Sequence, residues 1–182
     1  RRRSIGLGRA PTREGSGTTR EPVAAGGERI CTIAAVGEID GRLNLASAWE
    51  AIADEVGDSI AVSVAGRHFS WTDFDDRAAR LATTMVAHGL GPDSKVALYL
   101  YNGNEYPEAQ YAAFKVRGIP ANVNYRYTGD ELAYILDNSD AEAVFFDHTL
   151  ADRLEVVRER CPALRLAVQV GGVEVPDWAC LL

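Results

Sequence analysis

A glycine- and hydroxyl-rich string near the start of the chain, Gly15–Val23, is the best candidate in the sequence for a phosphate-binding loop. It reads GSGTTREPV. Backbone N–H groups and hydroxyls in such a loop could donate hydrogen bonds to phosphate oxygens, and a basic residue would add charge. No strand-like run leads into the string, and a short motif counts only in its structural context. We therefore interpret the string as a coincidence of composition. The sequence also lacks GxGxxG and GxxxxGK[ST], the loops that hold phosphates in common nucleotide-binding proteins.

Three histidines, His68, His88 and His148, are the next residues whose type could do chemistry. No two of them have metal-ligand spacing such as HExxH. His88 falls in the last turn of a predicted helix, where the helix dipole explains a histidine. Asp147-His148 follows a predicted parallel strand, a position at which α/β proteins place sites, but no further group converges on it. We predict no catalytic, cofactor-binding or metal-binding role for these residues.

Three aspartates, Asp73, Asp75 and Asp76, occupy the first turn of another predicted helix. Carboxylates at the positive end of a helix are a simpler interpretation than a metal site. Asn102–Glu105 follow a buried strand, where they would line a cleft or form a turn and helix cap. The cluster at 125–127 (Tyr-Arg-Tyr) would stack on a ligand or pack against further protein, and we favour packing.

The amino-acid composition limits the classes of protein to which the chain could belong. The chain has 182 residues, of which 47% are apolar and 25% charged, as in an ordinary globular domain. Its net charge of −7 argues against a nucleic-acid binder. No run approaches the roughly 20 apolar residues of a membrane span. Cys31, Cys161 and Cys180 include no CxxC pair, so we expect free thiols and a cytoplasmic protein.

Residues 1–43 differ in composition from the rest of the chain. They are rich in Gly, Arg, Thr and Ala, with few large apolar residues before Ile30, so we expect a disordered extension. The globular part is 44–182, where Asn44 is a predicted N-cap for a helix that stops at Gly57. A β-hairpin of 60–64 and 68–71 follows. The next helix, which ends at Gly89, is predicted to have Thr72 as its cap and Asp75 at the capping-box position.

From Val96 onward the sequence alternates between strand-like and helical patterns. Strands are expected to start near 96, 121, 143 and 164, and each interval fits one helix with two short loops. We predict that Gly118 ends the first of these helices in a left-handed conformation and that Pro120 lies at a strand start. The fold class is α/β: a parallel sheet with flanking helices. The predicted helical faces are Ala109, Ala112, Ala113 and Val116; Leu132, Ile135 and Leu136; and Leu150, Leu154, Val157 and Cys161.

The stretch 95–136 resembles the amino-terminal part of the adenylate-forming superfamily, the acyl-CoA synthetases and their relatives. The resemblance extends over 45–170. The family's Ser/Thr/Gly-rich phosphate loop ends in lysine, whereas Gly15–Val23 has Arg20 at a glycine position and Val23 at the lysine position. The matching residues are Lys95-Val96-Ala97-Leu98, Asn102, Glu105, Phe114-Lys115-Val116-Arg117-Gly118, Asn122-Val123-Asn124-Tyr125-Arg126-Tyr127 and Glu131-Leu132-Ala133-Tyr134-Ile135-Leu136.

The resemblance implies a partial AMP-binding domain. The full-length protein would be an acid–thiol ligase that activates a fatty or related hydrophobic acid with Mg-ATP and transfers the acyl group to coenzyme A. The phosphate loop, a glutamate-bearing motif and a lysine of the family lie outside the matched region, so no catalytic residue is carried over. We expect ATP, Mg²⁺ and coenzyme A for the full-length protein, none of them bound tightly by this chain, which alone should be inactive.

Two other interpretations remain open at this point. An α/β unit of this kind could be a non-catalytic module that binds a partner or regulates one. A complete small nucleotide-binding protein is the other, and it would need a phosphate loop that the sequence does not show. The sequence gives no indication of the oligomeric state.

Overall fold

The computed structural model describes residues 44–173 and 180–181. The predicted extension 1–43, with the string Gly15–Val23 and Cys31, lies outside the described residues. The helices and strands, in chain order, are α1 (Leu45–Val56), β1 (Ile60–Val64), β2 (Arg67–Ser70), α2 (Trp71–Ala87), β3 (Lys95–Tyr99), α3 (Glu105–Lys115), β4 (Ile119–Asn122), α4 (Gly129–Asn138), β5 (Ala141–Asp147), the 3₁₀ helix η2 (His148–Leu154), α5 (Glu155–Arg160), β6 (Leu166–Val170) and β7 (Cys180–Leu181).

The predicted parallel sheet is confirmed. Its strands lie in the order β4-β3-β5-β6-β7, and every neighbouring pair is parallel. Ala97 of β3 pairs with Ala121 on one side and Val144 on the other. The order reverses beside β3, because the chain first adds β4 on one side and then β5 on the other. β7 is an addition to the four strands that the sequence predicts.

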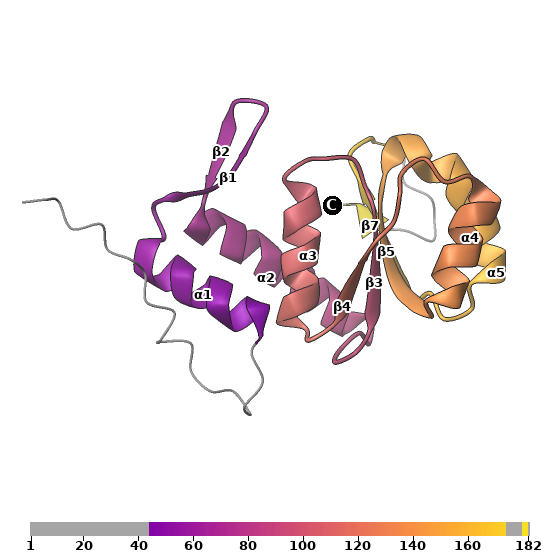
Figure 1. Ribbon diagram of the computed structural model, residues 1–182, viewed down its shortest axis with the longest axis horizontal. Helices are drawn as coiled ribbons and strands as arrows, with labels where there is room; N and C mark the ends of the chain where they lie inside the picture. Colours follow the sequence, from indigo (N-terminus) through magenta and orange to yellow (C-terminus); the bar gives the residue numbers. More distant parts are fainter. Residues whose placement is uncertain (1–43, 174–179, 182) are drawn as a thin grey trace, which may run out of the picture. The chain divides into compact units, whose positions relative to one another are not determined.

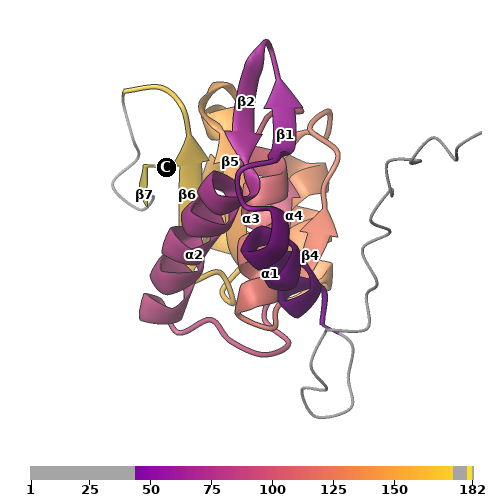
Figure 2. The same ribbon diagram turned by 90° about the vertical axis from the view of Figure 1, so that its left-hand side faces the viewer.

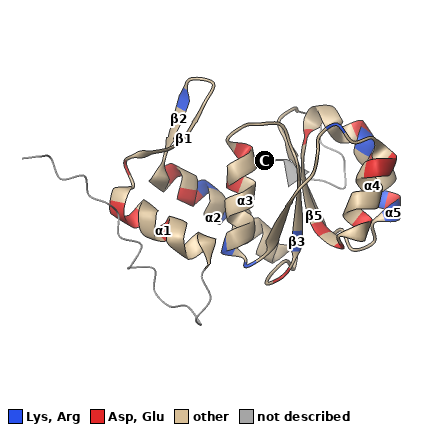
Figure 3. Ribbon diagram, in the orientation of Figure 1, with Lys and Arg blue, Asp and Glu red and all other residues tan. Residues whose placement is uncertain are grey.

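Helices cover both faces of the sheet (Figure 1). Alternate residues of β5 face opposite ways: Ala143 and Phe145 pack with α2 and α3, whereas Val144 and Phe146 pack with α4, η2 and α5. All four are fully buried, and each phenylalanine stabilises the fold by about 1.5–3 kcal/mol through burial. A sheet buried on both faces explains why its strands are almost wholly apolar. In Figure 3 the charged residues lie mainly on the helices and at the strand ends.

The β1–β2 hairpin and α1 pack on the outer side of α2 and α3 (Figure 2). The hairpin is confirmed as an antiparallel pair with a two-residue turn, Ala65-Gly66, in which both residues have positive φ. Asn44 caps α1 as predicted, with its side chain accepting from Ala46 N at 2.7 Å. Ring contacts with centroid separations of 4.9–6.5 Å join Trp49, Trp71, Phe74, Tyr111 and Phe114.

The predicted cap of α2 is wrong. Ser70, not Thr72, is the N-cap, and it forms a capping box with Asp73. The Asp73 N–H donates to Ser70 Oγ at 3.0 Å, and the Ser70 N–H donates to the Asp73 carboxylate. The helix starts earlier because β2 runs directly into it and Ser70 still pairs with Ile60 of β1. Asp75 therefore takes no part in the cap of α2.

The predicted role of Gly118 is also wrong. Arg117 takes the left-handed conformation after α3, with φ of 64°. Gly118 instead permits a close approach of two backbones, because a Cβ there would lie 2.8 Å from Ser94 O. The predicted face Leu150–Cys161 is buried, but its first half is the 3₁₀ helix η2 and only its second half is α-helical.

Candidate functional site at the carboxyl edge of the sheet

All strands of a parallel sheet end at the same edge, and ligands bind where the strand order reverses. In this chain the reversal lies between β3 and β5, because the connection after β3 leads to β4 on one side and the connection after β5 leads to β6 on the other. The predicted cluster Asn102–Glu105 follows β3, the cluster at 125–127 follows β4, and Asp147-His148 joins β5 to η2. The topology thus brings three of the candidate clusters to one edge.

A pocket of about 400 Å³ opens at this edge, beside the ends of β3 and β4. It joins two of the predicted clusters, since Asn102 and Tyr125 both line it. Amides and aromatic rings dominate its wall, a chemistry suited to hydrogen bonding and to stacking on a planar group. Those residues are Asn102, Asn122, Asn124, Tyr106, Tyr125 and Tyr127.

Arg153 fixes the backbone of the loop that follows β4. One terminal nitrogen of its guanidinium donates to Tyr125 O at 2.7 Å and to Tyr127 O at 3.1 Å. The same nitrogen lies 3.0 Å from the hydroxyl of buried Tyr99, which itself donates to Tyr127 O. The bond to Tyr99 is the main cause that raises the pKa of Arg153. No sequence pattern identified Arg153, because its partners are 26–54 residues away.

Tyr125 of the pocket wall contacts two side chains next to the pocket, those of Tyr101 and Arg126. The rings of Tyr101 and Tyr125 are 4.8 Å apart, and the guanidinium of Arg126 lies 5.6 Å from the Tyr125 ring. Tyr101 and Tyr125 remain about 40% exposed. These three residues therefore offer aromatic faces and one positive charge to solvent beside the pocket.

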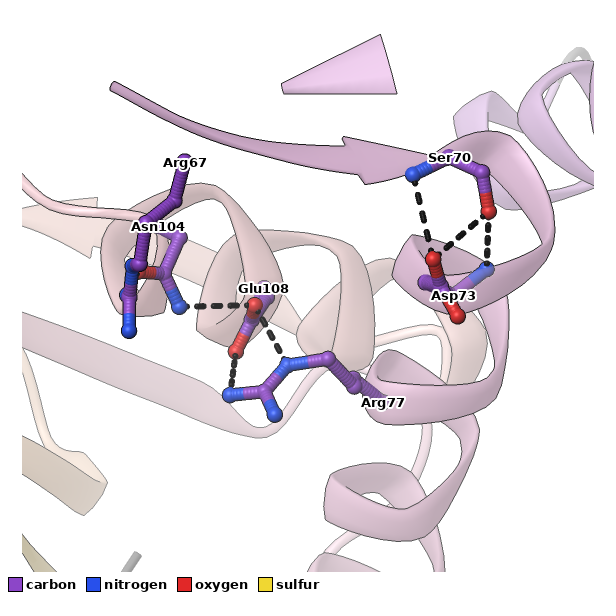
Figure 4. Close-up of polar contacts among 6 residues, drawn as sticks. All are labelled: Arg67, Ser70, Asp73, Arg77, Asn104 and Glu108. Carbon is purple, nitrogen blue, oxygen red and sulfur yellow. Dashed lines mark hydrogen bonds and ion pairs between the residues drawn. The ribbon is translucent and has the colours of Figure 1, made fainter. Parts of the chain in front are cut away.

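A buried polar network lies behind the β3–α3 turn (Figure 4). Arg77 of α2 donates from two nitrogens to the Glu108 carboxylate, at 2.6 and 2.9 Å. Asn104 donates to Glu108 at 3.0 Å and accepts from Arg67 at 2.6 Å. Asn104 and Glu108 are almost fully buried, so these bonds satisfy groups that water cannot reach. The sequence suggested only a turn and cap at Asn104, whose side chain makes no capping bond.

Asp75 belongs to a second network, where α1, α2 and α3 meet. It accepts hydrogen bonds from the hydroxyl of Tyr111 and from Lys115 Nζ, the latter at 2.8 Å. Lys115 also contacts Glu50 of α1 at 2.7 Å. Burial is the main cause that raises the pKa of Tyr111, followed by its bond to Asp75. Burial lowers the pKa of Lys115, but its bonds to Asp75 and Glu50 outweigh this and the net shift is upward.

The structure does not bring the three histidines together. His68 lies exposed on the hairpin, and His88 contacts the Thr84 carbonyl at the end of α2. His148 lies against Gly172, where a Cβ would come within 3.0 Å of its ring. Among residues 44–173 and 180–181, no group of three potential ligands could hold a metal ion. Cys161 is a buried free thiol whose pKa is raised by burial.

Neither lysine of the chain is placed to bind phosphate at the carboxyl edge. Lys95 begins β3 and thus lies at the opposite edge of the sheet, while Lys115 is occupied by two carboxylates. Arg153 is likewise occupied by carbonyl and hydroxyl oxygens. The described residues therefore do not reproduce a phosphate loop with a lysine.

Fold and site define an α/β protein with a doubly covered parallel sheet and a ligand-sized pocket at the carboxyl ends of β3 and β4. Residues 49–181 match the family model described as AMP-binding enzyme, and the chain belongs to that family. It is 38% identical over 128 residues to a 3-oxocholest-4-en-26-oate–CoA ligase of Rhodococcus rhodochrous, covering 70% of this chain and 23% of that protein. It is 32% identical over 146 residues to the medium-chain acyl-CoA ligase Mig of Mycobacterium avium, covering 71% and 26%.

Solved structures agree with this fold. A long-chain-fatty-acid-CoA ligase from Archaeoglobus fulgidus superposes with a TM-score of 0.66 at 22% identity, covering 72% of this chain and 28% of that one. The chain thus spans about a quarter of the length of the relatives it matches. Within the described residues, no helix combines the length and apolar character that a bilayer crossing requires.

Proposed function

We propose that this chain is the amino-terminal part of an AMP-forming acid–thiol ligase. The reaction would convert a carboxylic acid, ATP and coenzyme A to an acyl-CoA, AMP and diphosphate. The observation that carries the proposal is the family match over 49–181, which covers the whole parallel sheet. The named relatives are ligases, and they do not favour a non-catalytic partner-binding module.

The substrate is a hydrophobic carboxylic acid, such as a fatty acid or a compound of similar character. The names of the relatives support this class, since they act on a steroid-derived acid and on medium-chain acyl groups. ATP, Mg²⁺ and coenzyme A are the co-reactants that the reaction requires. The described residues do not fit Mg-ATP, because no lysine faces the carboxyl edge and no acidic cluster is present there for a metal.

In this proposal the chain provides part of the structural framework of the enzyme. Residues outside the described part provide the positive charge that stabilises the phosphates during the reaction. The test begins with the coding sequence that flanks these 182 codons. We expect it to encode a Ser/Thr/Gly-rich segment that ends in lysine, and we expect the whole product to catalyse acid-dependent exchange between pyrophosphate and ATP. A whole product without exchange across fatty and steroid acids would reject the proposal.

A further inference from the structure

The β1–β2 hairpin is hydrogen-bonded to the start of α3 through one buried amide. Arg67, the first residue of β2, donates to Asn104 Oδ1 at 2.6 Å. Asn104 Nδ2 in turn donates to Glu108 Oε1, one helical turn further on. Asn104 is only 2% exposed with Arg67 in place, so its amide relies on protein partners for its hydrogen bonds in the folded chain. We call the contact between Arg67 and Asn104 the hairpin link.

The hairpin link replaces a local cap at the start of α3. Helices α2 and α4 both begin with a capping box, whereas the N-cap side chain of α3, Asn104, makes no capping bond. The Asn104 carbonyl nevertheless accepts the first helical hydrogen bond, from Glu108 N–H, at 3.2 Å. The side chain of Asn104 is therefore held from two directions: by Arg67, 37 positions away, and by Glu108 of its own helix.

Asn104 stands between two residues of the carboxyl-edge pocket. Asn102 precedes it by two positions, Tyr106 follows it by two, and both line the pocket. The guanidinium of Arg67 is itself oriented by the Phe69 ring, 5.2 Å away. A displacement of Asn104 would move the turn and with it this wall of the pocket.

We propose that Arg67 is a positioning residue: acting through Asn104, the hairpin holds the β3–α3 turn and one wall of the carboxyl-edge pocket in place. The coupling is a property of the folded chain and holds whichever reaction the pocket serves.

Amide hydrogen exchange measured by NMR on the 182-residue chain tests the proposal. In Arg67→Ala, the Glu108 amide should exchange about tenfold faster, because a charge-assisted bond that holds the first turn of α3 is gone. In Arg67→Lys, which keeps one charged donor, the increase should be about threefold. The side-chain amide resonance of Asn102 should shift in both variants.

Two controls separate this role from a general loss of stability. The Leu132 amide, in the capped first turn of α4, should keep its exchange rate in every variant. Arg80→Ala removes an exposed arginine of α2 and should leave Glu108 unchanged. An unchanged Glu108 rate in Arg67→Ala, or equal acceleration of Glu108 and Leu132, would overturn the proposal. If Arg67→Ala does not fold, the same two outcomes in Arg67→Lys decide it.

Discussion

Lys115 and Asp75 form an ion pair at 2.8 Å between α3 and α2, with the Lys115 ammonium also 4.6 Å from the centre of the Tyr111 ring. Tyr111 donates to the same aspartate. Lys115 is only 11% exposed, so the charge of Asp75 is balanced where water has little access. This junction, with the aromatic contacts around Trp49, joins the three helices on one side of the sheet.

This junction should make the free energy of unfolding depend on pH in the alkaline range. The pKa values of Tyr111 and Lys115 are both raised in the folded state. A group whose pKa is raised by folding contributes its full stabilisation when the pH is below its pKa in the unfolded chain. It contributes progressively less as the pH rises above that pKa. We therefore predict that the free energy of unfolding falls above the ordinary tyrosine value of 10.0. Urea unfolding between about pH 8 and 11 measures this, and Tyr111→Phe should show a shallower fall. Equal slopes in the two proteins would contradict the assignment.

Removal of Arg77 should destabilise the fold. The Glu108 side chain is 1% exposed, and its carboxylate would lose the arginine that donates two hydrogen bonds to it. Because Arg77 itself is about a third exposed, water compensates part of the loss, and we predict that Arg77→Met costs about 2 kcal/mol. Arg80→Met, on the same helix, is the matched control and should cost about 0.5 kcal/mol or less. Equal urea midpoints for the two variants would show that the buried pair contributes nothing.

Two glycines that differ in their surroundings allow a test of close backbone approach. A methyl group at Gly118 would lie 2.8 Å from Ser94 O, whereas at Gly91 nothing lies within 4 Å. We predict that Gly118→Ala costs about 1–3 kcal/mol through overpacking. Gly91→Ala should be neutral or stabilise by about 0.5 kcal/mol. Thermal unfolding distinguishes the two, and a neutral Gly118→Ala would rule out the contact.

The start of α2 can be tested with two neighbouring hydroxyls. Ser70→Ala removes the N-cap and should destabilise the chain by about 1 kcal/mol. Thr72→Ala removes a hydroxyl that makes no capping bond and should have less than about half that effect. Greater sensitivity at Thr72 in chemical unfolding would restore the cap that the sequence suggested.

Periodicity was sufficient to predict the layers of the fold. The faces Ala109–Val116 and Leu132–Leu136 appear in the structure as predicted, because burial against a sheet imposes the helical period directly on the sequence. The cap of α2 was missed because Ser70 and Thr72 each precede an aspartate by three residues. Only the pairing of Ser70 with Ile60 decides between them, and that contact is tertiary.

The polar networks could not be predicted for the same reason. Arg77 and Glu108 are 31 residues apart, and Arg67 and Asn104 are 37 apart. No local rule relates residues so far apart in the sequence. The resemblance to a family does not relate them either, because it rests on the order and spacing of residues along the chain. At 117–118 the local rule gave the wrong residue, because the need for space at Gly118 outweighed the usual preference for glycine at positive φ. The prediction that this chain carries no catalytic, cofactor or metal residue stays a prediction.

The measurement that tests the central claim most directly is pyrophosphate–ATP exchange by the purified 182-residue chain. Mg-ATP, labelled pyrophosphate and a medium-chain fatty acid would be supplied together, with the intact Mycobacterium avium relative as the positive control. The account predicts exchange by the control and none above the protein-free blank for this chain, because its described lysines face away from the carboxyl edge or are paired. Acid-dependent exchange by this chain alone would contradict it.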